Sequence, residues 1–383
     1  MLIDVLPNAE FFTIAPGRVN LLGEHVDYNG GPVLPAAIDR AVHLAVQRRA
    51  DRRVSLRAID IDQSVIFDLD RLDGKQDVEG RPLPVWALYP AGVAWVLQRR
   101  GLAVSGLDGA YTSRVPIGSG LSSSAAIELA FAVAWRELGG WPADSLELAQ
   151  YSQQAENQYV GVNCGLMDQF ASACGVEDHA LYFDTRSLYW RPVPLPPGTA
   201  IVVADSGMRR SLTSSGYNDR RAACEQAVEL LKPDLPGITA LRDVTPEQFN
   251  RLAGRLPEIV RKRARHVVEE CARVDEAMQY LDRGDSAAFG RLMYAGHASL
   301  RDLYEVSIPE LDRLVELASD LPGCLGARLT GAGFGGCTVN LVAEEAASQF
   351  IERLAQGYHA TTGRTAQVYL CHASQGAHVS DHE

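Results

Sequence analysis

A run of glycine and serine residues, Gly118 to Ser124, is followed at once by the alanine-rich apolar segment Ala125 to Trp135. This order predicts a loop that opens directly onto a helix. Backbone N–H groups at such a helix start lack partners within the helix and bind phosphate, and the serine hydroxyls add donors to an anion or a ligand to a cation. A Ser/Gly linker before a core helix is the alternative. The candidate phosphate-binding residues are Gly118, Ser119, Gly120, Leu121, Ser122, Ser123 and Ser124.

Two common nucleotide-binding motifs do not explain this loop. A Walker A loop requires lysine followed by Ser or Thr, and none of the chain's three lysines is followed by either residue. Gly331, Gly333 and Gly336 have the Rossmann spacing, but they lie near the C-terminus without an acidic residue placed for a ribose. We therefore expect these glycines to form a tight turn between strands.

Two groups of polar residues could act on a sugar hydroxyl. Glu24, His25 and Asp27 lie beside the turn at Asn29 and can hydrogen-bond hydroxyl groups; a charged hairpin end in water is the alternative. Asp168 lies among apolar neighbours, where a carboxylate needs a partner.

Asp168 has the chemistry that phosphoryl transfer to an alcohol requires, because a carboxylate must accept or orient the hydroxyl proton. Arg18 is a candidate partner, since its charge persists at all relevant pH values, while helix capping is the alternative for Asp168. Ser124 and Glu156 could supply the hard oxygen ligands that Mg²⁺ requires. An exposed helix carboxylate is the alternative for Glu156.

Helices and strands are mixed along the chain, which indicates an α+β fold. The proline-rich segment Arg191 to Gly198 predicts a boundary between domains at 1–190 and 191–383. Apolar runs between turn residues predict strands over 12–22, 32–38, 42–47, 54–59, 110–114, 200–205, 324–328, 337–342 and 366–371. Helical patterns cover 86–99, 124–138, 145–159, 219–231 and 261–280.

Composition narrows the class of protein. The 383 residues suit two domains or one large one, and 46% hydrophobic with 22% charged residues is typical of a globular protein. A net charge of −12 argues against a nucleic-acid partner. No apolar run has membrane-spanning length and no leader is evident, so we expect a cytoplasmic protein without a membrane partner. The seven cysteines contain no C-x-x-C pair and indicate reduced thiols.

Five segments together resemble one family, in the family's order and over most of the chain. Pro16–Asn29 is similar to the galactokinase signature, Pro116–Ala125 resembles the phosphate loop of the GHMP kinase superfamily, and Leu329–Cys337 resembles its third motif. Cys164–Phe170 and Ser215–Arg221 resemble segments of galactokinases in particular.

The resemblance implies a two-domain GHMP-kinase-like fold with the active site in the cleft between the domains. It implies ATP and Mg²⁺ as cofactors and phosphorylation of α-D-galactose at the anomeric hydroxyl. The implied roles are general base for Asp168, transition-state stabiliser for Arg18, and magnesium ligands for Ser124 and Glu156. The positions that match sugar-binding residues are Glu24, His25, Val26, Asp27, Gly165 and Tyr217.

Three positions depart from the family pattern: Val26, Gly216 and Ala332 stand where many relatives have Thr, Glu and Gly. Two alternatives stay open. One is a GHMP kinase for another sugar, namely N-acetylgalactosamine, galacturonate or arabinose, and the other is a non-catalytic galactose sensor. The whole loop, with Arg18 and Asp168 both present, favours an enzyme. We expect a monomer.

Overall fold

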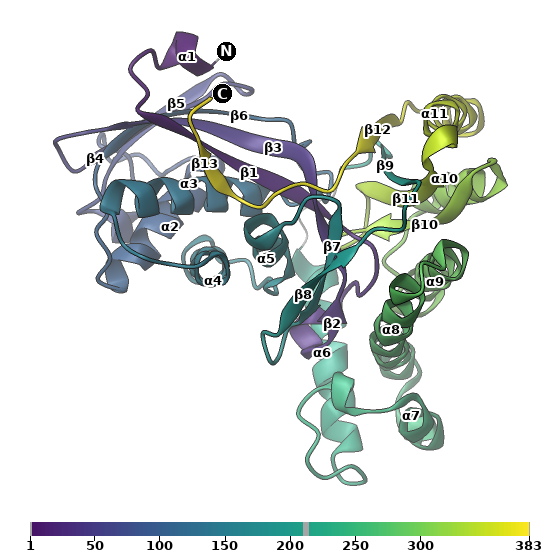
Figure 1. The fold of residues 1–383 in the computed structure, drawn as a ribbon. Coiled ribbons are helices and arrows are strands. Elements are labelled where there is room, and N and C mark those ends of the chain that lie inside the picture. Colours follow the sequence, from purple (N-terminus) through teal and green to yellow (C-terminus); the bar gives the residue numbers. More distant parts are fainter. Residues whose placement is uncertain (1, 210–213, 383) are drawn as a thin grey trace.

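The computed structural model describes residues 2–209 and 214–382. The first half is built on a six-stranded sheet of order β13-β1-β3-β6-β4-β5 (Figure 1). Among these strands β4 and β6 are parallel, and the other neighbours are antiparallel. The strands are β1 (Phe11–Asn20), β3 (Pro35–Arg48), β4 (Arg53–Ala58), β5 (Gln63–Asp68), β6 (Leu107–Ser113) and β13 (His378–Ser380).

Helices cover one face of this sheet, and the alanine-rich helix is the central one. It packs against β1 and β3 and buries most of its side chains, since alanine allows close approach between a helix and a sheet. The short helix α1 (Leu2–Val5) precedes β1. The covering helices are α2 (Val85–Arg99), α3 (Ser123–Gly139), α4 (Ser145–Ala155) and α5 (Met167–Cys174).

The second half contains a four-stranded antiparallel sheet of order β10-β11-β9-β12. Helices α9 (Ser286–Ser299), α10 (Pro309–Asp320) and α11 (Ala347–Thr362) pack against it. Figure 1 shows α6, α7 and α8 extending away from this sheet. The remaining bounds are β9 (Thr199–Asp205), β10 (Cys324–Thr330), β11 (Cys337–Ala343), β12 (Gln367–Cys371), α6 (Ser214–Leu231), α7 (Pro246–Leu252) and α8 (Glu258–Asp282).

A third, smaller sheet lies between the two halves. It has the order β2-β7-β8 and consists of β2 (Pro32–Val33), β7 (His179–Asp184) and β8 (Trp190–Pro194). One continuous apolar core contains residues of both halves, from Val19 in β1 to Leu329 in β10. The segment that follows β1 is therefore held at the junction of the two halves.

Most expected elements are present, with informative differences. The turn at 331–336 does connect β10 and β11, and the expected helix over 145–159 begins with Asp144 and Glu147 capping each other at 2.8 and 2.9 Å. That helix ends early, at Ala155. Strand β8 occupies part of the proline-rich segment, and β13 returns from the chain's end to pair with β1. The division at 190/191 stays a prediction.

No helix in the described part of the chain is both long enough and apolar enough to cross a bilayer.

Candidate active site

The glycine–serine loop leads into α3 as expected, and its backbone is unusual. Gly118, Gly120 and Ser122 have φ of 70°, 83° and 62°, a left-handed conformation that is uncommon for a non-glycine residue such as Ser122. The Ser122 hydroxyl donates to Asp168 Oδ2 at 2.5 Å, and the Ser119 hydroxyl donates to the Pro116 carbonyl at 2.7 Å. The hydroxyls of Ser122 and Ser119 therefore stabilise the conformation of the site through hydrogen bonds to other protein atoms.

Arg18 and Asp168 are brought together from positions far apart in the chain. Arg18 donates from Nε and Nη2 to Asp168 Oδ1 at 2.9 and 2.7 Å, and its Nη1 donates to the Gly120 carbonyl at 2.6 Å. The Leu121 side chain is buried, and its carbonyl accepts from the Arg18 backbone N–H at 3.1 Å. One guanidinium group thus connects the carboxylate with the glycine–serine loop.

Asp168 lies in the first turn of α5, where the helix dipole favours a negative charge. The Arg18 side chain is 4% exposed, whereas that of Asp168 is 30% exposed. The carboxylate is therefore fixed by a buried cation while it remains open on one side. Its side-chain bonds go to Arg18 and Ser122, so the expected pairing with Arg18 is present.

The turn after β1 brings two of the predicted sugar-binding residues, Glu24 and Asp27, beside this pair. Glu24 accepts from the Gly331 N–H at 2.6 Å and from Asn20 Nδ2 at 2.8 Å, and burial raises its pKa. Asp27 packs against Gly165 so closely that a Cβ atom at position 165 would lie 1.8 Å from Asp27 Oδ2. Only glycine is compatible with this position of Asp27.

The surroundings of Asp27 strongly affect the titration of its carboxylate. Burial raises its pKa to about 7, and the negative charges of Asp168 and Glu24 add to the rise. Between the unfolded pKa of about 3.9 and this value, the folded state binds more protons than the unfolded state. The free energy of unfolding contributed by Asp27 therefore falls as pH rises from about 4 to about 7.

We expect Asp27→Asn to be more stable than the wild type at pH 8, by about 1 kcal/mol or more, because one pKa unit corresponds to about 1.4 kcal/mol. The difference should shrink toward pH 5, where the wild-type carboxyl is protonated. Urea unfolding of the sugar-free proteins at both pH values measures this. An equal difference at pH 5 and pH 8 would contradict it.

His25 and Tyr217 lie together on the other side of the turn. His25 has φ of 63°, and its ring lies 5.7 Å from that of Tyr217. The Tyr217 ring also meets Tyr28 edge-on at 5.2 Å. Val26 differs from these residues, because its side chain is fully buried in the core and its carbonyl accepts N–H groups within the turn. A sugar contact by Val26 stays a prediction.

Ser124 and Glu156 are the predicted magnesium ligands, and the Ser124 side chain acts on Glu156 in the direction of a lower pKa. Glu156 begins a π-helical turn (Glu156–Val160) that follows α4 directly, and such turns are frequent at functional sites. Burial raises the pKa of Glu156 to about 7. In the described residues no group of three or more His, Cys, Asp or Glu side chains could hold a metal ion. Magnesium needs only one or two such ligands beside water and phosphate, so this pair fits it.

A second buried carboxylate, Glu128, lies next to Glu156 and was not among the predicted site residues. Gln169 Nε2 donates to Glu156 at 2.6 Å and to Glu128 at 3.0 Å. Burial and the neighbouring Glu156 raise the pKa of Glu128 well above its ordinary value. The sequence signal for Glu128 was its place in the middle of an alanine-rich helix. A charged residue at such a place is rarely buried without a partner.

A buried ion pair behind the turn was also missed. Arg328 donates to Glu270 at 2.9 Å with both side chains fully buried, and Glu270 accepts from the Gly23 N–H at 2.9 Å. Burial alone would raise the pKa of Glu270, but Arg328 and Arg273 hold it below its usual range. The pair ties β10 and α8 to the start of the turn.

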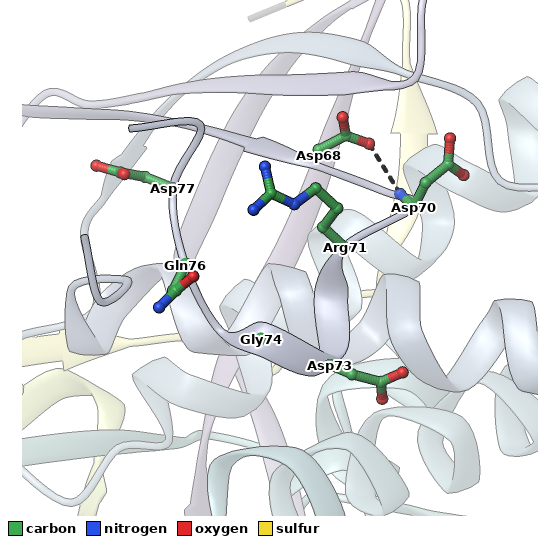
Figure 2. A pocket seen from close by; sticks show the side chains of 7 residues that line it. All are labelled: Asp68, Asp70, Arg71, Asp73, Gly74, Gln76 and Asp77. Atoms are coloured by element: carbon green, nitrogen blue, oxygen red, sulfur yellow. Dashed lines mark hydrogen bonds between the residues drawn. The ribbon is translucent and has the colours of Figure 1, made fainter. Parts of the chain in front are cut away.

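A pocket of about 210 Å³ lies elsewhere in the first half (Figure 2). None of the described residues that line it is a predicted site residue. Its lining residues are Asp68, Asp70, Arg71, Asp73, Gly74, Gln76 and Asp77.

Comparison with known proteins agrees with this fold. The family model of the GHMP kinases N terminal domain matches residues 89–176, and that of the GHMP kinases C terminal matches 277–360. A galactokinase galactose-binding signature matches residues 5–48. Mevalonate kinase from Methanococcus jannaschii shares the fold, with a TM-score of 0.68 at 19% identity over 96% of this chain and 99% of that one. The fold and the site therefore define a GHMP kinase.

Individual relatives identify the family within this class. The galactokinase of Roseiflexus sp. (strain RS-1) is 49% identical over 94% of this chain and 91% of that protein, and the galactokinase of Chloroflexus aggregans is 46% identical with the same coverage. The structure of Lactococcus lactis galactokinase complexed with galactose superimposes with a TM-score of 0.91, at 35% identity over 98% of this chain and 97% of that one. This chain belongs to the galactokinase family. The resemblance is confirmed, and the chain is an ATP-using kinase.

Proposed function

We propose that this chain transfers the γ-phosphoryl group of ATP to the anomeric hydroxyl of α-D-galactose, giving galactose 1-phosphate and ADP. The observation that carries the proposal is the contact of Arg18 with both Asp168 and Gly120. It links a partly exposed carboxylate to a loop suited to phosphate, beside a turn suited to sugar hydroxyls. The solved galactokinase that binds galactose supports the choice of sugar.

Asp168 acts as the general base in this proposal. Its carboxylate accepts the proton of the anomeric hydroxyl as that oxygen attacks the γ-phosphorus, and the bond to the β-phosphate oxygen breaks to release ADP. Arg18 holds the Asp168 carboxylate in place through two hydrogen bonds and offsets the charge on the transferring group. Positioning and electrostatic stabilisation carry most of such a reaction.

The loop Gly118–Ser124 binds the phosphates of ATP, through backbone N–H groups at the start of α3. Glu24, His25, Asp27, Gly165 and Tyr217 surround the sugar. Ser124 and Glu156 would hold Mg²⁺, which neutralises phosphate charge when bound. The influence of Ser124 on the pKa of Glu156 supports this pairing.

We expect Ser124→Ala and Glu156→Gln to raise the Mg²⁺ concentration needed for half-maximal activity more than they raise KM for galactose. Each change removes one hard oxygen or one negative charge from a cation with few protein ligands. Magnesium titrations at saturating galactose measure the effect, and Ser123→Ala is the matched control for loss of a neighbouring hydroxyl. Titration curves that coincide for the wild type and both variants would refute the assignment.

A coupled assay of ADP release over a panel of sugars tests the proposed substrate. We expect turnover with galactose and none with 1-deoxygalactose, which lacks the accepting hydroxyl. Preference for N-acetylgalactosamine, galacturonate or arabinose would assign another sugar kinase activity. Galactose binding without ADP release would indicate a sensor. The monomeric state and the cytoplasmic location stay predictions.

A further inference from the structure

A chain of hydrogen bonds runs through the interior from α6 to the glycine-rich turn at 331–336, between β10 and β11. Cys224 Sγ lies 3.4 Å from Tyr304 Oη, which lies 2.7 Å from Tyr28 Oη. Tyr28 Oη lies 2.9 Å from His25 Nδ1, and His25 Nε2 lies 3.2 Å from the Ala332 carbonyl oxygen. The chain therefore connects four separate segments around the sugar-binding turn.

The last contact gives the chain a direction. A carbonyl oxygen can only accept, so Nε2 of His25 carries a hydrogen. Burial disfavours the charged ring, and in the neutral ring Nδ1 is then an acceptor. Tyr28 must donate to it, and because each phenol has one hydrogen, Tyr28 accepts from Tyr304 and Tyr304 accepts from the Cys224 thiol.

Within this series of hydrogen bonds, Tyr304 is held in place by several contacts. It ends a π-helical turn (Leu300–Tyr304) and its side chain is fully buried. Arg220 Nε donates to the Tyr304 carbonyl at 3.3 Å, and Arg263 donates to the Leu303 carbonyl. Two guanidinium groups thus fix the backbone that presents the phenol.

The Tyr304 ring also contacts two histidines of the site. It lies 4.8 Å from the ring of His25 and 4.5 Å from that of His266, and His266 Nε2 donates to the Glu24 carbonyl at 3.1 Å. His25 itself has the left-handed φ of 63°, which costs free energy and persists only where the surroundings impose it. Asn29 Nδ2 donates to the His25 carbonyl at 3.1 Å, while the Tyr28 hydroxyl and the Tyr304 ring hold the His25 side chain.

We propose that Tyr304 is a positioning residue for the sugar-binding turn, acting through Tyr28 to fix the tautomer and the orientation of His25. The inference rests on the proposed function, because its kinetic effect is on galactose. Asp27 immediately precedes Tyr28, so the bonds of the Tyr28 hydroxyl also restrain the segment that presents the Asp27 carboxylate.

Tyr304→Phe keeps the ring and removes only the hydroxyl. We expect KM for galactose to rise about 3- to 10-fold, the effect of one neutral hydrogen bond, while kcat and KM for ATP change less than about twofold. Tyr28→Phe should have the same effects on KM for galactose, kcat and KM for ATP. If Tyr304 acts through Tyr28, the double variant should be no worse than Tyr28→Phe, because the two effects are then not additive.

Tyr358→Phe is the matched control. Tyr358 is fully buried in the separate core of the second half, and its hydroxyl donates to the Ser206 carbonyl at 3.0 Å. This variant should lose comparable stability without a change in KM for galactose. An equal rise in KM for Tyr358→Phe and Tyr304→Phe, or additive effects of Tyr28→Phe and Tyr304→Phe, would overturn the proposal.

Nitrogen-15 NMR of histidine-labelled, sugar-free protein tests the direction of the chain independently of turnover. The His25 signal, assigned by its loss in His25→Gln, should show a hydrogen on Nε2 and a hydrogen-bonded, unprotonated Nδ1. Tyr28→Phe should shift Nδ1 most. A hydrogen on Nδ1, alone or with one on Nε2, would overturn the inference. A wild type that fails to phosphorylate galactose would instead refute the proposed function and leave this spectrum unchanged.

Discussion

Asp168→Asn should reduce kcat by about 10²- to 10⁴-fold, the usual contribution of a general base. Asparagine nearly matches aspartate in shape: its Oδ1 can still accept from Arg18 and its Nδ2 can donate to Ser122 Oγ. Its amide does not take up the hydroxyl proton. Steady-state kinetics with saturating galactose and ATP measure the loss, and thermal unfolding checks that the fold is kept.

Asp144→Asn is the matched control for this change. Asp144 caps α4 by accepting the Glu147 N–H at 2.8 Å, and asparagine caps helices about as well. We expect its kcat to equal that of the wild type. Asp168→Asn retaining a tenth or more of the wild-type kcat would show that Asp168 is not the base.

Asp27→Ala should bring galactose and glucose closer together as substrates. The two sugars differ only in the direction of the C4 hydroxyl, which apolar walls would separate poorly. A carboxylate fixed by Gly165 to accept from the axial hydroxyl would be left unpaired by the epimer. Sites that recognise such a hydroxyl discriminate by about 10⁴ or more, so the wild type should show essentially no activity with glucose.

The test of this prediction is kcat/KM for both sugars on both proteins. Asp27→Ala should lose far more kcat/KM with galactose than with glucose. Magnesium dependence is an internal control, because Asp27 is not one of the proposed ligands. An unchanged ratio of galactose to glucose would contradict the role given to Asp27.

The candidate phosphate loop and the candidate base could be predicted from sequence because their signals are local. Glycines and serines before an alanine-rich run predict the start of α3 almost to the residue. A carboxylate such as Asp168 among apolar neighbours needs a cationic partner. Arg18 is that partner, although 150 positions separate the two residues. Their pairing depends on α5 packing against β1.

Other parts of the site have no local signal. Tyr28 and Tyr304 are 276 positions apart. In the sequence, neither can be distinguished from an ordinary core tyrosine. The helical pattern continues to Tyr159, so it does not reveal the wider turn that starts at Glu156. The strand β13 is short and pairs only at the edge of the first sheet, where an apolar run is not required.

Identification of the product tests most directly whether phosphate is transferred to the anomeric oxygen of galactose. Galactose labelled with carbon-13 at C1 is incubated with ATP, Mg²⁺ and enzyme, and the sugar phosphate is analysed by carbon-13 and phosphorus-31 NMR. We expect an α-configured product whose C1 signal is split by phosphorus, formed in step with ADP and lost with Asp168→Asn. Phosphate on any other carbon, or ADP release without a sugar phosphate, would contradict it.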